Sequence, residues 1–338
     1  MGDRSRSDHT REPAAEAGDA RTLRFTTGVA RADAALRMVV ARFEAAFPGR
    51  AQGYYVTGSY ATGDALPTSD FDVTVVMRGA LDVGARAAAD WLAARCAADA
   101  PIELDIAVDD EASLLADGAH PSFTLGSQLV YSADGDDVRP RTPLPLLAEW
   151  TRDRMSTSYW RLVNLFGRLP VVRYPLAYPD ADDEFYGYLR RPLRLPDGSE
   201  VVCTRDLIRA TGWAATALLA WRAGVYVGSK RDCHLLYRQH IGDEWADLLT
   251  DIYECCARRW RYLIPAASEE RARLRSICDA TLGFENHFLL ACRKFLLTEL
   301  RSGDPERQRA ATHTLALLPY ADDEIAAAMQ ATVNTSAT

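Results

Sequence analysis

The chain has 338 residues, of which 47 are acidic and 39 basic, and a formal net charge of −8. Its length allows two domains, each with a core of its own, and a hydrophobic fraction of 48% is ordinary for a globular protein. The negative charge repels a polyanion, which disfavours a long nucleic-acid duplex as a partner but does not rule out a local basic groove. No apolar run reaches the roughly eighteen residues of a membrane span.

Both ends of the chain are polar. Residues 1–22 lack the apolar stretch of a secretory signal, and we expect them to be disordered, as are residues 332–338. The seven cysteines show no CxxC spacing, and their odd number leaves at least one unpaired. We therefore interpret them as reduced core thiols of a cytoplasmic protein.

The first part of the chain, residues 23–140, alternates helical and strand patterns. Apolar periodicity predicts helices over residues 28–46, 82–98 and 111–115, and strands over 53–57, 71–77, 102–108 and 128–131. A proline-rich joint with Pro140, Pro143 and Pro145 follows. We place a domain boundary there, because such joints commonly separate domains.

Beyond the joint, residues 146–331 are predicted to form a mostly helical domain. The expected helices span residues 146–167, 205–223, 230–240, 243–260, 269–300, 305–317 and 322–332. The segment 169–202, rich in Pro, Tyr and Asp, is too long for a routine connector. We interpret it as a functional loop.

Three carboxylates stand out in the first part. Asp70 and Asp72 are two residues apart on an expected strand, so both side chains project from the same face. Carboxylates held close together repel one another unless a hard cation such as magnesium neutralises them. Asp105, on the next expected strand, would complete the site if the two strands are neighbours. Such a set suits a two-metal displacement, with ions roughly 3.5–4 Å apart.

Gly58 and Ser59 precede the carboxylates and supply a second half of the pattern. A glycine lets a phosphate approach the backbone closely, and nearby amides and the serine hydroxyl can donate to its oxygens. Taken singly, the three carboxylates could be solvated side chains, and Gly58-Ser59 could be a plain turn. The combination favours a site for a triphosphate and its metal.

The spacing of these motifs resembles the DNA polymerase β-type nucleotidyltransferase superfamily. Thr57-Gly58-Ser59, ten intervening residues, Ser69-Asp70-Phe71-Asp72-Val73 and the later Asp105 carry the resemblance, which covers roughly residues 28–135. It implies an α+β chain, with a mixed-sheet α/β nucleotidyltransferase domain before the helical domain. It also implies that Asp70 and Asp72 bind magnesium, that Asp105 binds a second ion or takes a proton, and that ATP or another NTP is the co-substrate.

Within this superfamily the chain is most similar in layout to aminoglycoside adenylyltransferases. Gly228-Ser229-Lys230 before a helix resembles their segment near the nucleotide, which implies that Lys230 contacts the triphosphate. The reaction implied is transfer of a nucleoside monophosphate, AMP from ATP, to a hydroxyl of a small molecule, with an aminoglycoside-like acceptor as one candidate. A solvated Lys230 is the alternative interpretation.

The acceptor itself is not defined by these motifs. Asp180, Asp182, Asp183 and Glu184, followed by aromatic residues, are a candidate site for a cationic acceptor, or simply a solvated loop. Two other classes of function stay open: a catalytically idle fold acting as a binding or antitoxin-type module, and an RNA-directed terminal nucleotidyltransferase, which would need a basic groove.

Overall fold

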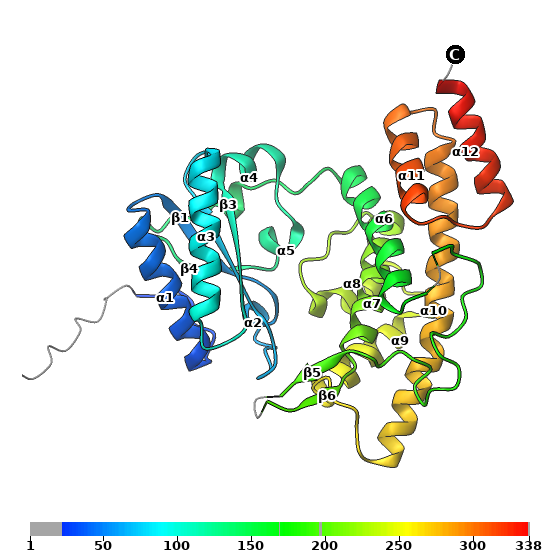
Figure 1. Cartoon of the computed structure of the whole chain (residues 1–338), viewed down its shortest axis with the longest axis horizontal. Helices are drawn as coiled ribbons and strands as arrows, with labels where there is room; N and C mark the ends of the chain where they lie inside the picture. Colours follow the sequence, from blue (N-terminus) through cyan, green and yellow to red (C-terminus); the bar gives the residue numbers. More distant parts are fainter. Residues whose placement is uncertain (1–21, 169, 196–197, 337–338) are drawn as a thin grey trace, which may run out of the picture.

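The structure, a computed structural model, describes residues 22–168, 170–195 and 198–336, with the backbone alone for 333–336. Residues 1–21 and 337–338, most of the predicted disordered ends, lie outside the described residues. Figure 1 shows a sheet-bearing half, coloured blue to cyan, and a mostly helical half, coloured green to red. The predicted α+β class is therefore confirmed.

A mixed four-stranded sheet organises the first half. Its strands are ordered β3-β2-β1-β4; β2 and β3 are parallel, whereas β1 pairs antiparallel with both β2 and β4. The elements of this half are α1 (Ala30–Ala46), β1 (Ala51–Val56), α2 (Gly58–Thr62), β2 (Phe71–Met77), α3 (Val83–Asp99), β3 (Leu104–Asp110), α4 (Glu111–Asp117), α5 (Pro121–Thr124), β4 (Gln128–Tyr131) and η1 (Arg139–Arg141). The sequence analysis missed α2 and α5, two very short helices.

Alternation along the strands gives the sheet two buried faces. Tyr54 and Val75 belong to a core under α1 and α3, whereas Tyr55 and Val76 face a smaller core with Phe123. Helices α1 and α3 lie side by side over one face of the sheet (Figure 1).

The second half is built around α10 (Ser268–Leu300), the long helix that runs through it in Figure 1. The other elements are α6 (Leu147–Leu165), β5 (Pro192–Arg194), β6 (Glu200–Val202), α7 (Arg205–Leu218), η2 (Leu219–Ala223), α8 (Lys230–His240), α9 (Ala246–Asp251), η3 (Ile252–Arg259), α11 (Pro305–Leu317) and α12 (Asp323–Ser336). Helix α12 continues to Ser336, so the predicted helix end near residue 332 was too early.

Two features of this half differ from the predicted pattern. The segment 169–202 contains an antiparallel pair, β5 and β6, where a loop alone was expected. Each of the helices predicted over 205–223 and 243–260 ends as a π-helix, η2 and η3. Because the apolar spacing of an α-helix and of a short π-helical continuation is similar, periodicity did not separate them.

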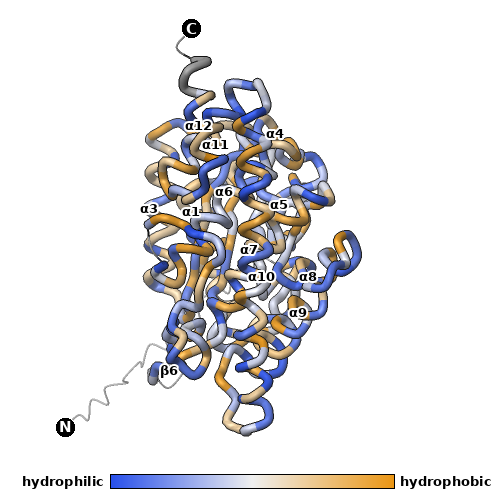
Figure 2. Tube along the Cα trace, turned by 90° about the vertical axis from the view of Figure 1, so that its right-hand side faces the viewer, coloured by the Kyte–Doolittle hydropathy of each residue, from blue (hydrophilic) through white to orange (hydrophobic). Residues whose placement is uncertain are grey.

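Hydrophobic and hydrophilic residues alternate along the helices throughout the chain (Figure 2). Among the described residues, no helix combines the length and the apolar character that crossing a membrane requires. All seven cysteines are buried and free, which confirms their interpretation as core thiols.

The two halves contact each other at several points. A Cβ placed on Gly126 would lie 2.4 Å from the Gly228 carbonyl oxygen, so the two backbones are in close contact there. Arg205 donates to the Thr68 carbonyl over 2.5 Å, and the Tyr253 hydroxyl lies 3.2 Å from Asp64 Oδ2. The joint between η1 and α6 is where we predicted a domain boundary; the division at 23–140 and 146–331 stays a prediction.

Candidate active site

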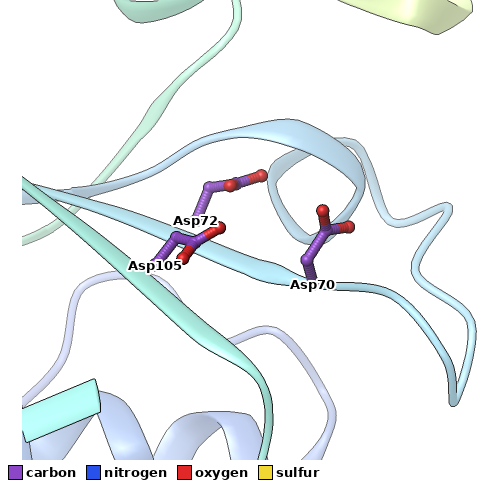
Figure 3. Close-up of side chains that lie close together, drawn as sticks. All are labelled: Asp70, Asp72 and Asp105. Carbon is purple, nitrogen blue, oxygen red and sulfur yellow. The ribbon is translucent and has the colours of Figure 1, made fainter. Parts of the chain in front are cut away.

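Asp70, Asp72 and Asp105 come together at one end of the sheet. One carboxylate oxygen of each lies within 4.8 Å of those of the other two. Asp72 and Asp105 are register partners on the parallel strands β2 and β3, and Asp70 lies on the segment that enters β2 (Figure 3). The strands β2 and β3 are therefore neighbours, as the predicted site requires.

The electrostatics of the cluster are unfavourable without a counter-ion. Burial, the Asp70 charge and the Asp105 charge raise the pKa of Asp72 to about 6, and Lys230 opposes the shift. The other two side chains are exposed. This is the behaviour of carboxylates that share a site with too little positive charge.

Gly58 stands directly against this cluster. Its φ of +66° is a conformation that only glycine adopts readily, and a Cβ there would lie 2.7 Å from Asp72 Oδ2. Ser59 follows in the first turn of α2, and within the described chain its hydroxyl forms no hydrogen bond. The absence of a side chain at Gly58 therefore leaves room for the Asp72 carboxylate, which a larger residue would displace.

The cluster opens into a cavity of about 560 Å³ between the two halves. Asp70, Asp72, Gly58 and Ser59 line it from the sheet, and Lys230 lines it from the start of α8. Burial in the cleft lowers the pKa of Lys230, and Asp70 opposes this shift. Five of the predicted site residues therefore line one cavity. Asp105 belongs to the carboxylate cluster but does not line the cavity.

Six arginines also line this cavity, and the sequence analysis missed all of them: Arg191, Arg205, Arg209, Arg231, Arg258 and Arg261. Positive side chains of this number suit a polyphosphate, which carries several negative charges. One signal was visible in the sequence, since Arg205 and Arg209 are four residues apart and share a helix face. The others come from segments far apart in the chain.

The acidic segment from Asp180 to Glu184 is not part of this cavity. Glu184 pairs with Arg271 at 2.5 Å and Asp180 with Arg190 at 3.3 Å, while Asp183 accepts backbone hydrogen bonds from Phe185 and Gly187. Asp182 is exposed on the same turn. These four acids therefore lie apart from the carboxylate cluster, and their role in binding an acceptor stays a prediction.

The carboxylate cluster fits magnesium. Three oxygen donors within 4.8 Å of one another, two of them on paired strands, are the hard ligands that this ion prefers. The raised pKa of Asp72 shows that positive charge is lacking at this point. Asp70 and Asp72 would hold an ion at the cavity, and Asp105 is placed to share a second one.

The chain was compared with known proteins. Residues 36–117, which contain Gly58 and all three carboxylates, match the family model described as Nucleotidyltransferase domain. Over these residues the chain is similar to a nucleotidyltransferase domain, as its motifs predicted. No curated protein matches the chain. The finer resemblance to aminoglycoside adenylyltransferases stays a prediction.

Proposed function

We propose that the protein transfers a nucleoside monophosphate, AMP from ATP, to a hydroxyl group of a small molecule in a magnesium-dependent reaction. One observation carries the proposal: three carboxylates lie within 4.8 Å of one another, and two of them, Asp70 and Asp72, line a cavity that is also lined by Lys230 and six arginines. Acids that bind metal and cations that bind phosphate are both needed for this chemistry.

Each group has a definable part. Lys230, Arg205 and Arg209 hold the triphosphate, whose oxygens approach the backbone at Gly58. Asp70 and Asp72 would hold magnesium, which would supply charge neutralisation at the α-phosphate. Asp105 shares a second ion or accepts the proton of the acceptor. The main contribution of the chain is positioning and electrostatic stabilisation.

The reaction balances as a displacement at phosphorus. The acceptor oxygen forms a bond to the α-phosphorus, the bond from that phosphorus to the bridging β-phosphate oxygen breaks, and pyrophosphate leaves. The hydroxyl proton passes to Asp105 or to solvent. No oxidant or reductant is required.

The experiment is incubation of the full chain with Mg²⁺, each NTP in turn and a panel of hydroxylated small molecules. Mass spectrometry should detect a nucleoside monophosphate adduct, and the Asp70→Asn variant should not form it. An adduct formed equally by wild type and by a folded Asp70→Asn variant would contradict the proposal.

An RNA-directed terminal transferase is the second candidate, because the arginines make the cleft basic rather than acidic. The net charge of −8 argues against a long polyanion. Adding short RNA oligonucleotides to the panel decides between the two. Extension of RNA, with no small-molecule adduct, would favour this second candidate.

A further inference from the structure

A second cavity, of about 270 Å³, adjoins the first one and is lined mostly by the helical half, with His120 and Ser122 from the first half. The two share part of their walls, including Arg209, Lys230, Ile208 and Tyr253. A molecule in the second cavity would therefore lie next to a triphosphate held at the carboxylate cluster. This position is suited to an acceptor.

Among the described residues that line the second cavity, the charged arginine and lysine side chains are all positive. Arg154, Arg161, Arg209 and Lys230 line it, and among the described lining residues no side chain is a carboxylate. The cavity at the cluster, by contrast, has Asp64 as well as the catalytic acids on its wall. The second cavity should therefore attract anions and repel ammonium groups.

The arginines are only partly neutralised by their neighbours. Arg154 pairs with Asp153, and Arg209 lies 4.0 Å from Asp206. Arg161 forms no ion pair within the described part of the chain and lies over the Trp213 ring at 4.9 Å. Its positive charge is thus available to a ligand.

Two buried polar atoms on the wall also lack partners. His234 is 6% exposed and Trp150 4% exposed, yet His234 Nδ1 and Trp150 Nε1 form no hydrogen bond in the described structure. An indole N–H can only donate, so it needs an acceptor oxygen. Buried polar groups left unpaired are costly, and both of these groups belong to residues that line the second cavity.

The aromatic residues that line the second cavity are suited to contact with the ring of a ligand. Trp150 and Trp213 line the cavity, and Tyr253 stacks on His234 with ring centroids 4.5 Å apart. Burial, together with the Arg154 charge, lowers the pKa of His120 to about 4, so this wall residue is neutral at pH 7. Aromatic faces beside arginines are suited to a ring that carries an anionic group.

We propose that the second cavity binds the acceptor and that the acceptor carries a carboxylate or phosphate group beside a ring, held by Arg154 and Arg161. This inference rests on the proposed function. It replaces the polycationic, aminoglycoside-like acceptor expected from the sequence with an anionic one. The acceptor hydroxyl would reach the α-phosphate past the shared wall at Lys230.

Phenyl phosphate, phenylacetate and benzylamine share a ring and differ in charge, so they test the inference directly. Their binding to the full chain is measured by calorimetry for wild type, Arg161→Gln, Arg161→Lys and Arg152→Gln. Arg152 is on the same helix, α6, and pairs with Glu306 at 3.6 Å, outside both cavities. Mg²⁺–ATP affinity is measured alongside.

We expect at least one of the two anions to bind, at least tenfold more tightly than benzylamine. Arg161→Gln should weaken that binding about tenfold, Arg161→Lys less, and Arg152→Gln by less than twofold, with Mg²⁺–ATP affinity unchanged. Comparing phosphate with carboxylate identifies the preferred group.

Three results would overturn the inference: failure of both anions to bind, binding of benzylamine as tight as theirs, or anion binding unaffected by Arg161→Gln. Strict competition between the anion and Mg²⁺–ATP would instead assign the cavity to the nucleotide and also contradict it. Failure of the proposed function is distinct, because it would appear as absent Mg²⁺–ATP binding whatever the anions do.

Discussion

At the scale of single residues, Asp72 combines function with a cost in stability. Burial and the neighbouring carboxylates raise its pKa to about 6, well above the ordinary range of an aspartate, so the folded protein holds a proton there more tightly than the unfolded chain. As the pH falls from above 6 toward 4, protonation of Asp72 therefore stabilises the metal-free fold. Above pH 6 the ionised carboxylate destabilises it.

Replacing Asp72 with Asn should remove this cost together with activity. We expect Asp72→Asn to abolish nucleotide transfer and to raise the free energy of unfolding at pH 7, without metal, by on the order of 1–3 kcal/mol. Denaturant unfolding at pH 7 and pH 5 measures the effect, which should shrink at the lower pH. Asp90→Asn, on the exposed side of α3, is the control and should change neither quantity. A less stable Asp72→Asn variant would contradict this account.

The backbone conformation of Gly58 is the basis of a separate prediction. An alanine at Gly58 or at Gly79 would be strained by the positive φ, +66° and +62°, but only at Gly58 would the methyl group meet a carboxylate. Both variants should lose about 1–2 kcal/mol of stability. Gly58→Ala should also weaken Mg²⁺–ATP binding at least tenfold, as measured by calorimetry, whereas Gly79→Ala should not. Equal nucleotide affinities would show that Gly58 serves the backbone alone.

At the scale of secondary structure, the sequence predicted the parts of the site that lie on regular strands. Alternation around Asp72 and Asp105 was sufficient to place both carboxylates on one sheet, since each sits in an apolar strand. The arginines of the cleft could not be found in the same way. Arg191, Arg231 and Arg261 belong to separate segments, and only tertiary packing brings them together. The short helix α2 has too few residues to show a helical period.

The loop after α6 is fixed by a buried ion pair whose loss should be costly. Glu285, fully buried on α10, receives two hydrogen bonds from Arg168, of 3.0 and 2.6 Å, and one of 2.7 Å from the Tyr188 hydroxyl. Glu285→Ala leaves a buried arginine unpaired, so unfolding should become easier by about 3–5 kcal/mol. Tyr188→Phe should cost about 1 kcal/mol.

This prediction can be followed by tryptophan fluorescence during urea unfolding. Six of the seven tryptophans follow the proline-rich joint, so the signal reports mainly on the helical half. Glu269→Ala, exposed at the first turn of α10, is the matched control and should cost less than about 1 kcal/mol. If Glu285→Ala lowers the free energy of unfolding no more than this control, the hydrogen bonds of Glu285 to Arg168 and Tyr188 do not hold the loop.

At the scale of the whole molecule, neither half holds a complete site. The sheet contributes the carboxylates and Gly58, and the helical half contributes Lys230, the arginines and the second cavity. Contacts such as the hydrogen bond from the Tyr253 hydroxyl to Asp64 link the two halves. The sequence predicted two domains but could not supply the charge of the cleft between them, because the charge depends on how helices from different segments pack.

The most direct test follows the α-phosphate of ATP. Wild-type protein is incubated with Mg²⁺, with ATP labelled at either the α- or the γ-phosphate, and with phosphate-bearing, carboxylate-bearing, neutral and cationic acceptors. We predict that the α-label enters an acceptor, that pyrophosphate is released, and that folded Asp70→Asn and Asp72→Asn variants do neither. Transfer of the γ-label, or unchanged α-transfer by those variants, would contradict the account.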